Sequence, residues 1–432
     1  MMNTDDLRDQ YDAFPYPARD PRDEAKRLIV GSPSHLDELN HYVFGGHLAR
    51  RLAPRRRDDG GEATAPAGPF RVLVAGGGTG DATVMLAQHC ANAGIDADIL
   101  YLDLSEAARA VAEARIQARG LTNVRFRQGS LLDATTLGRF DYIDCCGVLH
   151  HLPDPDAGLR ALAAALAPGG GIGLMVYGCY GRTGVYPLQD ALRRLTAPTP
   201  RDGHPAGPHD AGGRVDIARR LVAALPATNW LVRNPFLGDH RRSDADLHDL
   251  LLNLRDRAYT VPELYALVDG AGLTVAGWIE PMRYDPATFI ADPRLRKRLA
   301  LLSEPDRAAV AEAVSGAAAK HIAYLVRPED RAAAPVPNAT AIPVLKGADG
   351  AAVANAVSAQ GWLPVDLAGL SLTLALPRLA VPLLRHIDGR TNLAALHNAV
   401  APDLPWDRFK AQFDAFYATL NGLNMLLLRW PD

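Results

Sequence analysis

The residues best suited to chemistry are a cluster of glycines and an aspartate that follows it. Residues 70–87 read FRVLVAGGGTGDATVMLA, an apolar run that breaks into four glycines within five residues. Glycines at such a turn let a ligand approach the backbone closely, because no Cβ stands in the way. The next apolar run, ILYLDLS, contains Asp103 near its end, where a carboxylate would accept hydrogen bonds from ribose hydroxyls. Together they predict a nucleoside-binding turn.

The spacing of the glycines narrows the choice of nucleoside. A dinucleotide-binding turn has the pattern GxGxxG. Here Gly76, Gly78 and Gly80 give GxGxG, and Asp81 stands where the third glycine would be. The spacing therefore argues against NAD, and the ligand need not contain phosphate.

A histidine pair is the second chemical feature. His150 and His151 follow the apolar run FDYIDCCGVL and precede a Leu-Pro turn. A histidine there would act as a general base near neutral pH. A structural histidine at a strand-to-helix turn is at least as good an interpretation of each. Asp244 and His248, four residues apart on a predicted helix, are too few ligands for a metal site, and we predict none.

The elements that must position these residues alternate between strand and helix patterns. Apolar runs predict strands at residues 72–76, 98–105, 124–130, 140–152, 171–178, 273–281 and 321–327. Helical periodicity fills most of the intervals, and Thr260 is predicted to cap the helix TVPELYALVDGAGL, which has proline in its first turn. The alternation predicts a parallel sheet with helices on both faces.

Composition limits the class of protein. The chain has 432 residues, 48% of them hydrophobic, with a formal net charge of -3, which predicts two or more domains and no nucleic-acid partner. Its four cysteines lack CxxC spacing, which favours reduced thiols and no zinc site. The acidic start MMNTDDLRDQYDAF and the lack of a long apolar run predict a cytoplasmic location away from membranes.

Segments rich in proline, glycine and alanine divide the chain. DDGGEATAPAGP (58–69) and PEDRAAAPVPNATAIP (328–343) are predicted linkers, and residues 196–213 a loop. The predicted units are an N-terminal arm and lid (1–69), a core (70–186 and 260–327), a substrate-binding insertion (187–259), a linker (328–343) and a small C-terminal domain (344–432).

Residues 70–327 resemble the class I S-adenosylmethionine-dependent methyltransferases. The matching segments are VLVAGGGTG, Asp103 in ILYLDLS, VRFRQGSLLD, GVLHHLPDP and LAPGGGIGLMVY, in the family's order. The resemblance implies a Rossmann-like, doubly wound sheet with S-adenosylmethionine as the cofactor. The residues that it implies for cofactor binding are Gly76, Gly77, Gly78, Gly80, Asp103, Leu104, Ser130, Leu131 and Gly147.

Two positions leave alternatives open. Val74 stands where many members of the family carry an acidic residue, so backbone carbonyls near Gly76 are an alternative contact for the methionine amino group. Ser130 is one candidate for the adenine contact. Asp133 is the other, unless it caps a helix.

Methyl transfer needs few dedicated side chains, because the sulfonium is already a strong electrophile. The candidate catalytic residues are His150, His151 and Tyr180. The candidate substrate contacts are Tyr11, Tyr16, Tyr177, Arg182, Tyr186, Arg257 and Tyr259. Tyrosines at these places would also simply cover the core. The stretch QYDAFPYP suits a lid over the cofactor cleft, and a plain packing arm is the alternative.

The C-terminal segment predicts three helices and a final apolar strand. LLRHIDGRTNLAAL resembles the winged-helix modules of some bacterial protein-lysine methyltransferases. The segment has few basic residues, so protein contact, including a homodimer, is favoured over DNA. We therefore expect methyl transfer to a peptide or protein side chain. The alternatives are a small-molecule acceptor and a non-catalytic protein that binds S-adenosylmethionine.

Overall fold

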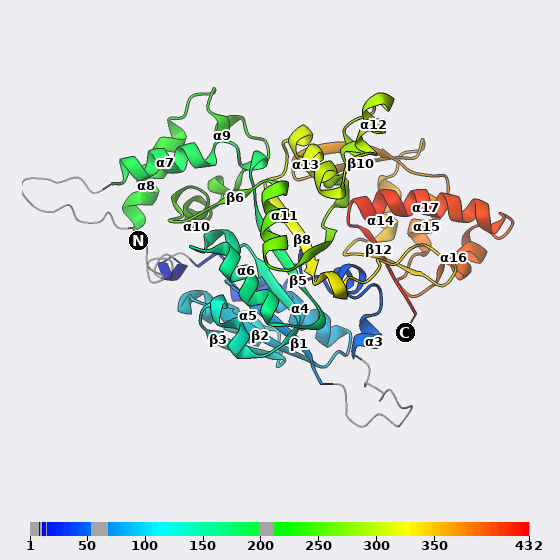
Figure 1. Ribbon diagram of the computed structural model, residues 1–432, viewed down its shortest axis with the longest axis horizontal. Helices are drawn as coiled ribbons and strands as arrows, with labels where there is room; N and C mark the ends of the chain where they lie inside the picture. Colours follow the sequence, from blue (N-terminus) through cyan, green and yellow to red (C-terminus); the bar gives the residue numbers. More distant parts are fainter. Residues whose placement is uncertain (1–7, 9–10, 14, 53–67, 198–210, 432) are drawn as a thin grey trace, which may run out of the picture.

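The central sheet of the protein is flanked on both faces by helices (Figure 1). The computed structural model describes the chain except for residues 1–7, 9–10, 14, 53–67, 198–210 and 432. Its main path of strands is β3 (Val124–Gln128), β2 (Ala97–Asp103), β1 (Phe70–Ala75), β4 (Phe140–Cys146), β5 (Leu166–Gly178), β8 (Lys320–Val326) and β7 (Thr274–Trp278), and β6 (Ala258–Tyr259) pairs with β5. Seven of these strands overlap the seven segments predicted as strands, and β6 was not predicted.

Alternating residues of the strands build two cores. Val72 and Val74 of β1 pack on one face with α4 (Asp81–Asn92) and α5 (Glu106–Ala118). Leu73 and Ala75 face the other way, toward α6 (Pro155–Ala164), α11 (Val261–Gly270) and α13 (Glu304–Ser315). The predicted cap of α11 is confirmed, since Thr260 and Glu263 form a reciprocal capping box.

The sheet is mostly parallel, as predicted, and one strand departs from that direction. β8 runs antiparallel to both of its neighbours, β5 and β7. After β7 the chain passes through α12 (Pro293–Leu299) and α13 and enters β8 at Lys320, which pairs with Tyr177 near the end of β5. The start of β8 therefore lies at the same edge of the sheet as the carboxyl end of β5.

The insertion is a helical unit with its own core. It contains α7 (Val185–Leu195), α8 (Ala211–Ala223), α9 (Trp230–Arg233), α10 (Asp244–Leu247) and the π-helix η7 (His248–Leu252). Leucines of α7 and η7 pack together there. α7 begins at Val185, close to the predicted start of the insertion. Most of the predicted loop at 196–213 lies outside the described residues, as does most of the predicted linker at 58–69.

The C-terminal part has a separate hydrophobic core. Its strands are β9 (Ile342–Leu345), which pairs with β12 (Leu426–Arg429), and the hairpin of β10 (Trp362–Leu367) and β11 (Leu370–Ala375). Its helices are α14 (Gly350–Ala356), α15 (Ala380–His386), α16 (Leu393–Val400) and α17 (Trp406–Gly422). The hairpin precedes the three predicted helices. The winged-helix description stays a prediction.

The N-terminal arm contains the short helices η1 (Pro21–Ala25), α2 (Leu36–Glu38), η2 (Leu39–Val43) and α3 (Leu48–Leu52). Glu38, which is fully buried, accepts a hydrogen bond from Tyr324 of β8 and forms an ion pair with Lys346 of the C-terminal part. The arm thus joins the sheet to the C-terminal part. Among the described residues, no helix combines the length and apolar character needed to cross a membrane.

Candidate active site

The glycine turn between β1 and α4 has a backbone that only glycine adopts easily. Gly76, Gly78 and Gly80 have φ values of 81°, 51° and 98°. A Cβ on Gly77 would lie 2.3 Å from the ring of Tyr101, so this position also excludes a side chain. A Cβ on Gly80 would lie 2.9 Å from Ala112 of α5. The first three glycines therefore form a bare backbone surface, and Gly80 allows close helix packing.

Asp103 ties this turn to the next helix. Its carboxylate accepts hydrogen bonds of 2.8 Å from the backbone N–H of Gly78 and of 2.8 Å from that of Ser105. Burial raises the pKa of Asp103, and these backbone donors oppose the rise. The carboxylate is thus held in place at the end of β2.

A cavity of about 390 Å³ lies against the turn. Of the predicted cofactor residues, those that line it are Gly76, Gly77, Gly78, Asp103, Leu104, Ser130, Leu131 and Gly147. Gly80 is absent from the lining. Ser130, rather than Asp133, caps the following short helix, η3 (Leu131–Leu137), by accepting from the N–H of Leu132.

The N-terminal arm closes one side of this cavity. Tyr11, Tyr16 and Pro17 line it. The carbonyl of Pro17 accepts a hydrogen bond of 2.7 Å from the Thr79 hydroxyl, and Arg19 forms an ion pair of 2.6 Å with Asp81. These contacts agree with the predicted position of the arm over the cleft. That the arm acts as a lid stays a prediction.

Asp144 is a functional candidate that the sequence reading missed. It lies on β4 directly beside Val74 of β1, in register, and lines the same cavity. Its side chain accepts a hydrogen bond of 2.5 Å from the hydroxyl of Ser34, and the residue is 2% exposed. Burial raises the pKa of Asp144 to about 7. Among the described residues, no cationic side chain forms an ion pair with it.

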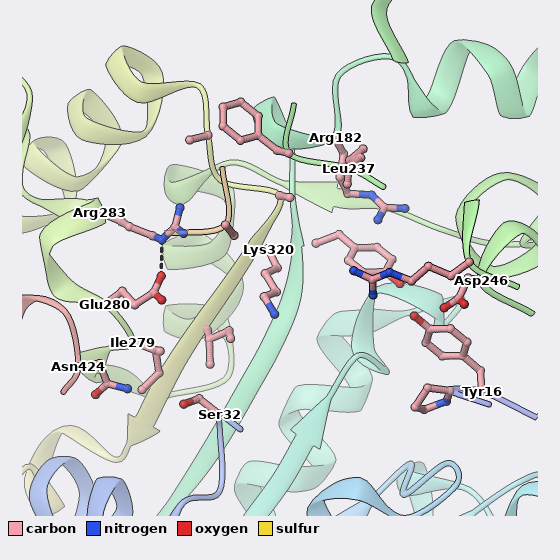
Figure 2. A pocket seen from close by; sticks show the side chains of 18 of the residues that line it. Tyr16, Ser32, Arg182, Leu237, Asp246, Ile279, Glu280, Arg283, Lys320 and Asn424 are labelled. Carbon is pink, nitrogen blue, oxygen red and sulfur yellow. Dashed lines mark hydrogen bonds and ion pairs between the residues drawn. The ribbon is translucent and has the colours of Figure 1, made fainter. Parts of the chain in front are cut away.

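A second cavity, of about 830 Å³, opens beside the first. Its walls come from the sheet edge, the insertion and the C-terminal part (Figure 2). The residues that line both cavities are Tyr16, Pro17, Tyr177, Arg182, Asp246 and Lys320. We call the smaller cavity the cofactor cavity and the larger one the acceptor cavity, and the shared residues form the junction between them.

A buried polar cluster supports the junction. The guanidinium of Arg182 lies 3.6 Å from the centre of the Tyr177 ring and forms an ion pair of 2.8 Å with Asp256. Tyr177 donates a hydrogen bond of 2.8 Å to Asp249. The predicted substrate contacts Tyr177 and Arg182 are therefore held in fixed orientations.

The two predicted catalytic histidines have different surroundings. His151 lines the cofactor cavity, and its Nδ1 lies 2.7 Å from the carbonyl oxygen of Arg255. His150 is 1% exposed and lines neither cavity. The centre of its ring lies 3.9 Å from the centre of the Tyr177 ring. Burial lowers the pKa of His150, and nearby His151 and Arg182 lower it further. His150 is thus neutral and lies behind His151.

Three side chains of the same cluster are close enough together to bind a metal ion. His150, His151 and Asp256 each offer one ligand atom within 4.8 Å of the others. Asp256 already accepts hydrogen bonds from Arg182 and from Gln189. A cation would therefore face a buried guanidinium, and we derive no metal site here.

Besides Gly80 and His150, four more predicted residues lie outside both cavities: Tyr180, Tyr186, Arg257 and Tyr259. Tyr180 is 42% exposed, whereas Tyr259 is buried at 1%. Arg257 lies over the Tyr259 ring, 4.5 Å from its centre. Their roles remain predictions, and the junction residues come from the N-terminal arm, the end of β5 and the short helix after it, α10 and the start of β8.

Residues 73–172 match a family model described as a methyltransferase domain. This range runs from β1 to the middle of β5 and contains the glycine turn, Asp103 and Asp144.

Among curated proteins, an uncharacterized protein of Synechococcus sp. is 33% identical over 303 residues, which cover 69% of this chain and 65% of that protein. The ubiquinone biosynthesis O-methyltransferase of Acinetobacter baumannii is 32% identical over 102 residues, or 23% of this chain and 40% of that enzyme. The chain therefore spans less than two thirds of the length of these relatives.

Among solved structures, PKMT2 of Rickettsia typhi in complex with AdoHcy aligns with a TM-score of 0.55 and 14% identity. The alignment covers 84% of this chain and 72% of that chain. At this identity the similarity establishes a shared fold. Because the alignment covers 84% of this chain, it includes residues of the insertion or of the C-terminal part as well as the sheet.

Proposed function

We propose that this chain, whose core is a class I S-adenosylmethionine-dependent methyltransferase domain, transfers a methyl group to a nucleophile held in the acceptor cavity. The observation that carries the proposal is the junction, where a cavity against a nucleoside-binding turn opens into a second cavity of ligand size. When bound, S-adenosylmethionine supplies an electrophilic methyl group and leaves as the neutral thioether S-adenosylhomocysteine.

The residues of the cofactor cavity fit this group. The bare backbone of residues 76–78 gives the nucleoside room, and the Asp103 carboxylate is positioned for the ribose hydroxyls. The predicted adenine contacts, Ser130 and Leu131, lie on the same lining. Asp144 supplies a carboxylate beside Val74, the position at which many members of the family carry an acidic residue.

Asp144 is proposed to bind the methionine amino group. Neighbouring strands lie about 4.8 Å apart, so a carboxylate on β4 beside Val74 reaches nearly the same part of the cavity as an acid on β1 would. A buried carboxylate without a cationic partner is unfavourable, and an ammonium group relieves that cost. In this proposal the contact takes the place of the backbone carbonyls considered from the sequence.

The pH dependence of binding should reveal this contact. An ammonium ligand prefers the Asp144 carboxylate, whose pKa is raised to about 7 without ligand. Affinity for S-adenosylhomocysteine should therefore be constant above that pH and fall below it, by up to about tenfold per pH unit. Asp144→Asn should weaken binding by about tenfold or more and should flatten this part of the profile. Calorimetric titrations from about pH 8 to about pH 6 test both expectations, and equal slopes in the two proteins would refute the contact.

His151 is proposed as the base that receives the proton of a protonated nucleophile. The Arg255 carbonyl can only accept a hydrogen bond, so Nδ1 of His151 carries the hydrogen and Nε2 is left with its lone pair. His150 and Tyr177 pack against this ring and fix its orientation. Tyr16 and the remaining junction residues line the path between the two cavities.

The acceptor class is tested by following the label from methyl-tritiated S-adenosylmethionine in a cell lysate. Label in acid-precipitable material would support the predicted peptide or protein side chain. Label in the soluble fraction would support a small molecule. No label despite cofactor binding would refute the proposed transfer and favour a binding protein. The cytoplasmic location and a homodimer through the C-terminal part stay predictions.

A further inference from the structure

Lys320 occupies the junction of the two cavities. It is the first residue of β8 and pairs with Tyr177, so the reversed direction of this strand places it beside the carboxyl end of β5. Its side chain projects between the Glu280–Arg283 pair on one side and Tyr16 and Asp246 on the other (Figure 2). Within the described part of the chain, no ion pair or hydrogen bond holds its ammonium group.

The charges lining the acceptor cavity leave one positive charge in excess. Six cationic side chains and two carboxylates line it: Arg19, Arg182, Arg242, Arg283, Lys320 and Lys346, with Asp246 and Glu280. Four of the cations form ion pairs, namely Arg19 with Asp81, Arg182 with Asp256, Arg283 with Glu280 and Lys346 with Glu38. Asp246 lowers the remaining sum to one positive charge, and Lys320 is the lining cation whose ammonium group has no ion pair or hydrogen bond in the described part of the chain.

Apolar side chains form part of the remaining wall, beside the polar side chains of Ser32, Ser243 and Asn424. Phe236, Leu237, Ile279, Ile322 and Leu423 line the cavity. Four non-glycine residues in the described part of the chain have positive φ, and three of them, Glu280, Ala368 and Asn424, line this cavity. Such conformations are costly and concentrate at functional sites. The Arg283 side chain donates to the Leu367 carbonyl, which links this wall to the C-terminal hairpin.

We propose that the methyl acceptor is a monoanion, a carboxylate joined to an apolar body, and that Lys320 binds its carboxylate. The inference rests on the proposed function and specifies its acceptor. A single unpaired ammonium balances a single negative charge, and the apolar side chains in the wall accommodate the rest of the molecule. A protonated lysine side chain would meet Lys320 as a like charge, which disfavours it as the acceptor. The carboxylate belongs either to a small acid or to an acidic peptide.

The test uses chemically blocked extracts as acceptors. One portion of extract is amidated at its carboxyl groups, one is reductively methylated at its amines, and one is untreated. Each is separated into small-molecule and peptide fractions and incubated with the full chain and labelled S-adenosylmethionine. We expect labelling of the untreated and amine-blocked extracts and at least a tenfold loss, about the value of a charged hydrogen bond, after carboxyl amidation. The labelled fraction identifies the source of the carboxylate.

Variants assign the effect to Lys320. Lys320→Met should reduce labelling at limiting acceptor by about tenfold or more, and Lys320→Arg should retain more of it. Lys297→Met is the matched control, because Lys297 is exposed on α12 and lines neither cavity. All variants should bind S-adenosylhomocysteine as the parent does.

Three outcomes would count against the account in different ways. Label that persists after carboxyl amidation would overturn the acceptor class alone. Equal losses of labelling and of S-adenosylhomocysteine affinity in Lys320→Met would also overturn it, since Lys320 would then bind the carboxylate of the cofactor. Cofactor binding without label in any extract would overturn the proposed transfer itself.

Discussion

Replacing Asp103 with alanine is expected to weaken S-adenosylhomocysteine binding by about 100-fold or more. Two hydrogen bonds from ribose hydroxyls to a buried carboxylate account for a loss of this size, at about 1.5 kcal/mol or more each. The substitution also removes the acceptor for the Gly78 and Ser105 N–H groups, which shape the glycine turn. Titration calorimetry on the parent and the variant measures the change.

Asp98→Ala is the matched control for this experiment. Asp98 lies on the same strand but outside the cofactor cavity, and it pairs with Arg125 near the protein surface. Its removal should leave the dissociation constant unchanged. If Asp103→Ala binds as tightly as Asp98→Ala does, the ribose assignment is wrong.

The second large effect is expected on stability. Asp256→Ala should lower the free energy of unfolding by about 3–5 kcal/mol, because it leaves the Arg182 guanidinium buried without its partner. The two side chains are 0% and 4% exposed and 2.8 Å apart. Urea denaturation followed by circular dichroism measures the loss.

An exposed ion pair provides the comparison. Asp190 and Arg194, one turn apart on α7, have side chains that are 52% and 77% exposed. Asp190→Ala should therefore change the free energy of unfolding by at most about 0.5 kcal/mol. Equal changes for the two variants would show that the buried pair does not stabilise the insertion against the sheet.

Much of the cofactor cavity was predictable from the sequence, because its residues follow apolar runs directly. The glycine turn ends β1 and Asp103 ends β2, and parallel strands bring such ends to one edge of the sheet. Asp144 was missed because its role depends on register between β1 and β4, which are more than sixty residues apart in the chain. The pattern of one sequence does not show which residues of two distant strands lie side by side.

The acceptor side was less predictable for a related reason. Lys320 reaches the junction only because β8 runs antiparallel, and the apolar run of that strand has the same pattern in either direction. Among the tyrosines in the last residues of β5 and just after it, the sequence did not distinguish Tyr177, which lines both cavities, from Tyr180, which is exposed. The cavity wall from the C-terminal part depends on contacts between distant segments.

The cofactor assignment is tested by equilibrium binding of S-adenosylmethionine to the full chain. We expect saturable binding of one molecule per chain, with no binding of NAD under the same conditions. Absence of S-adenosylmethionine binding by folded protein, or displacement of the bound molecule by NAD, would contradict it.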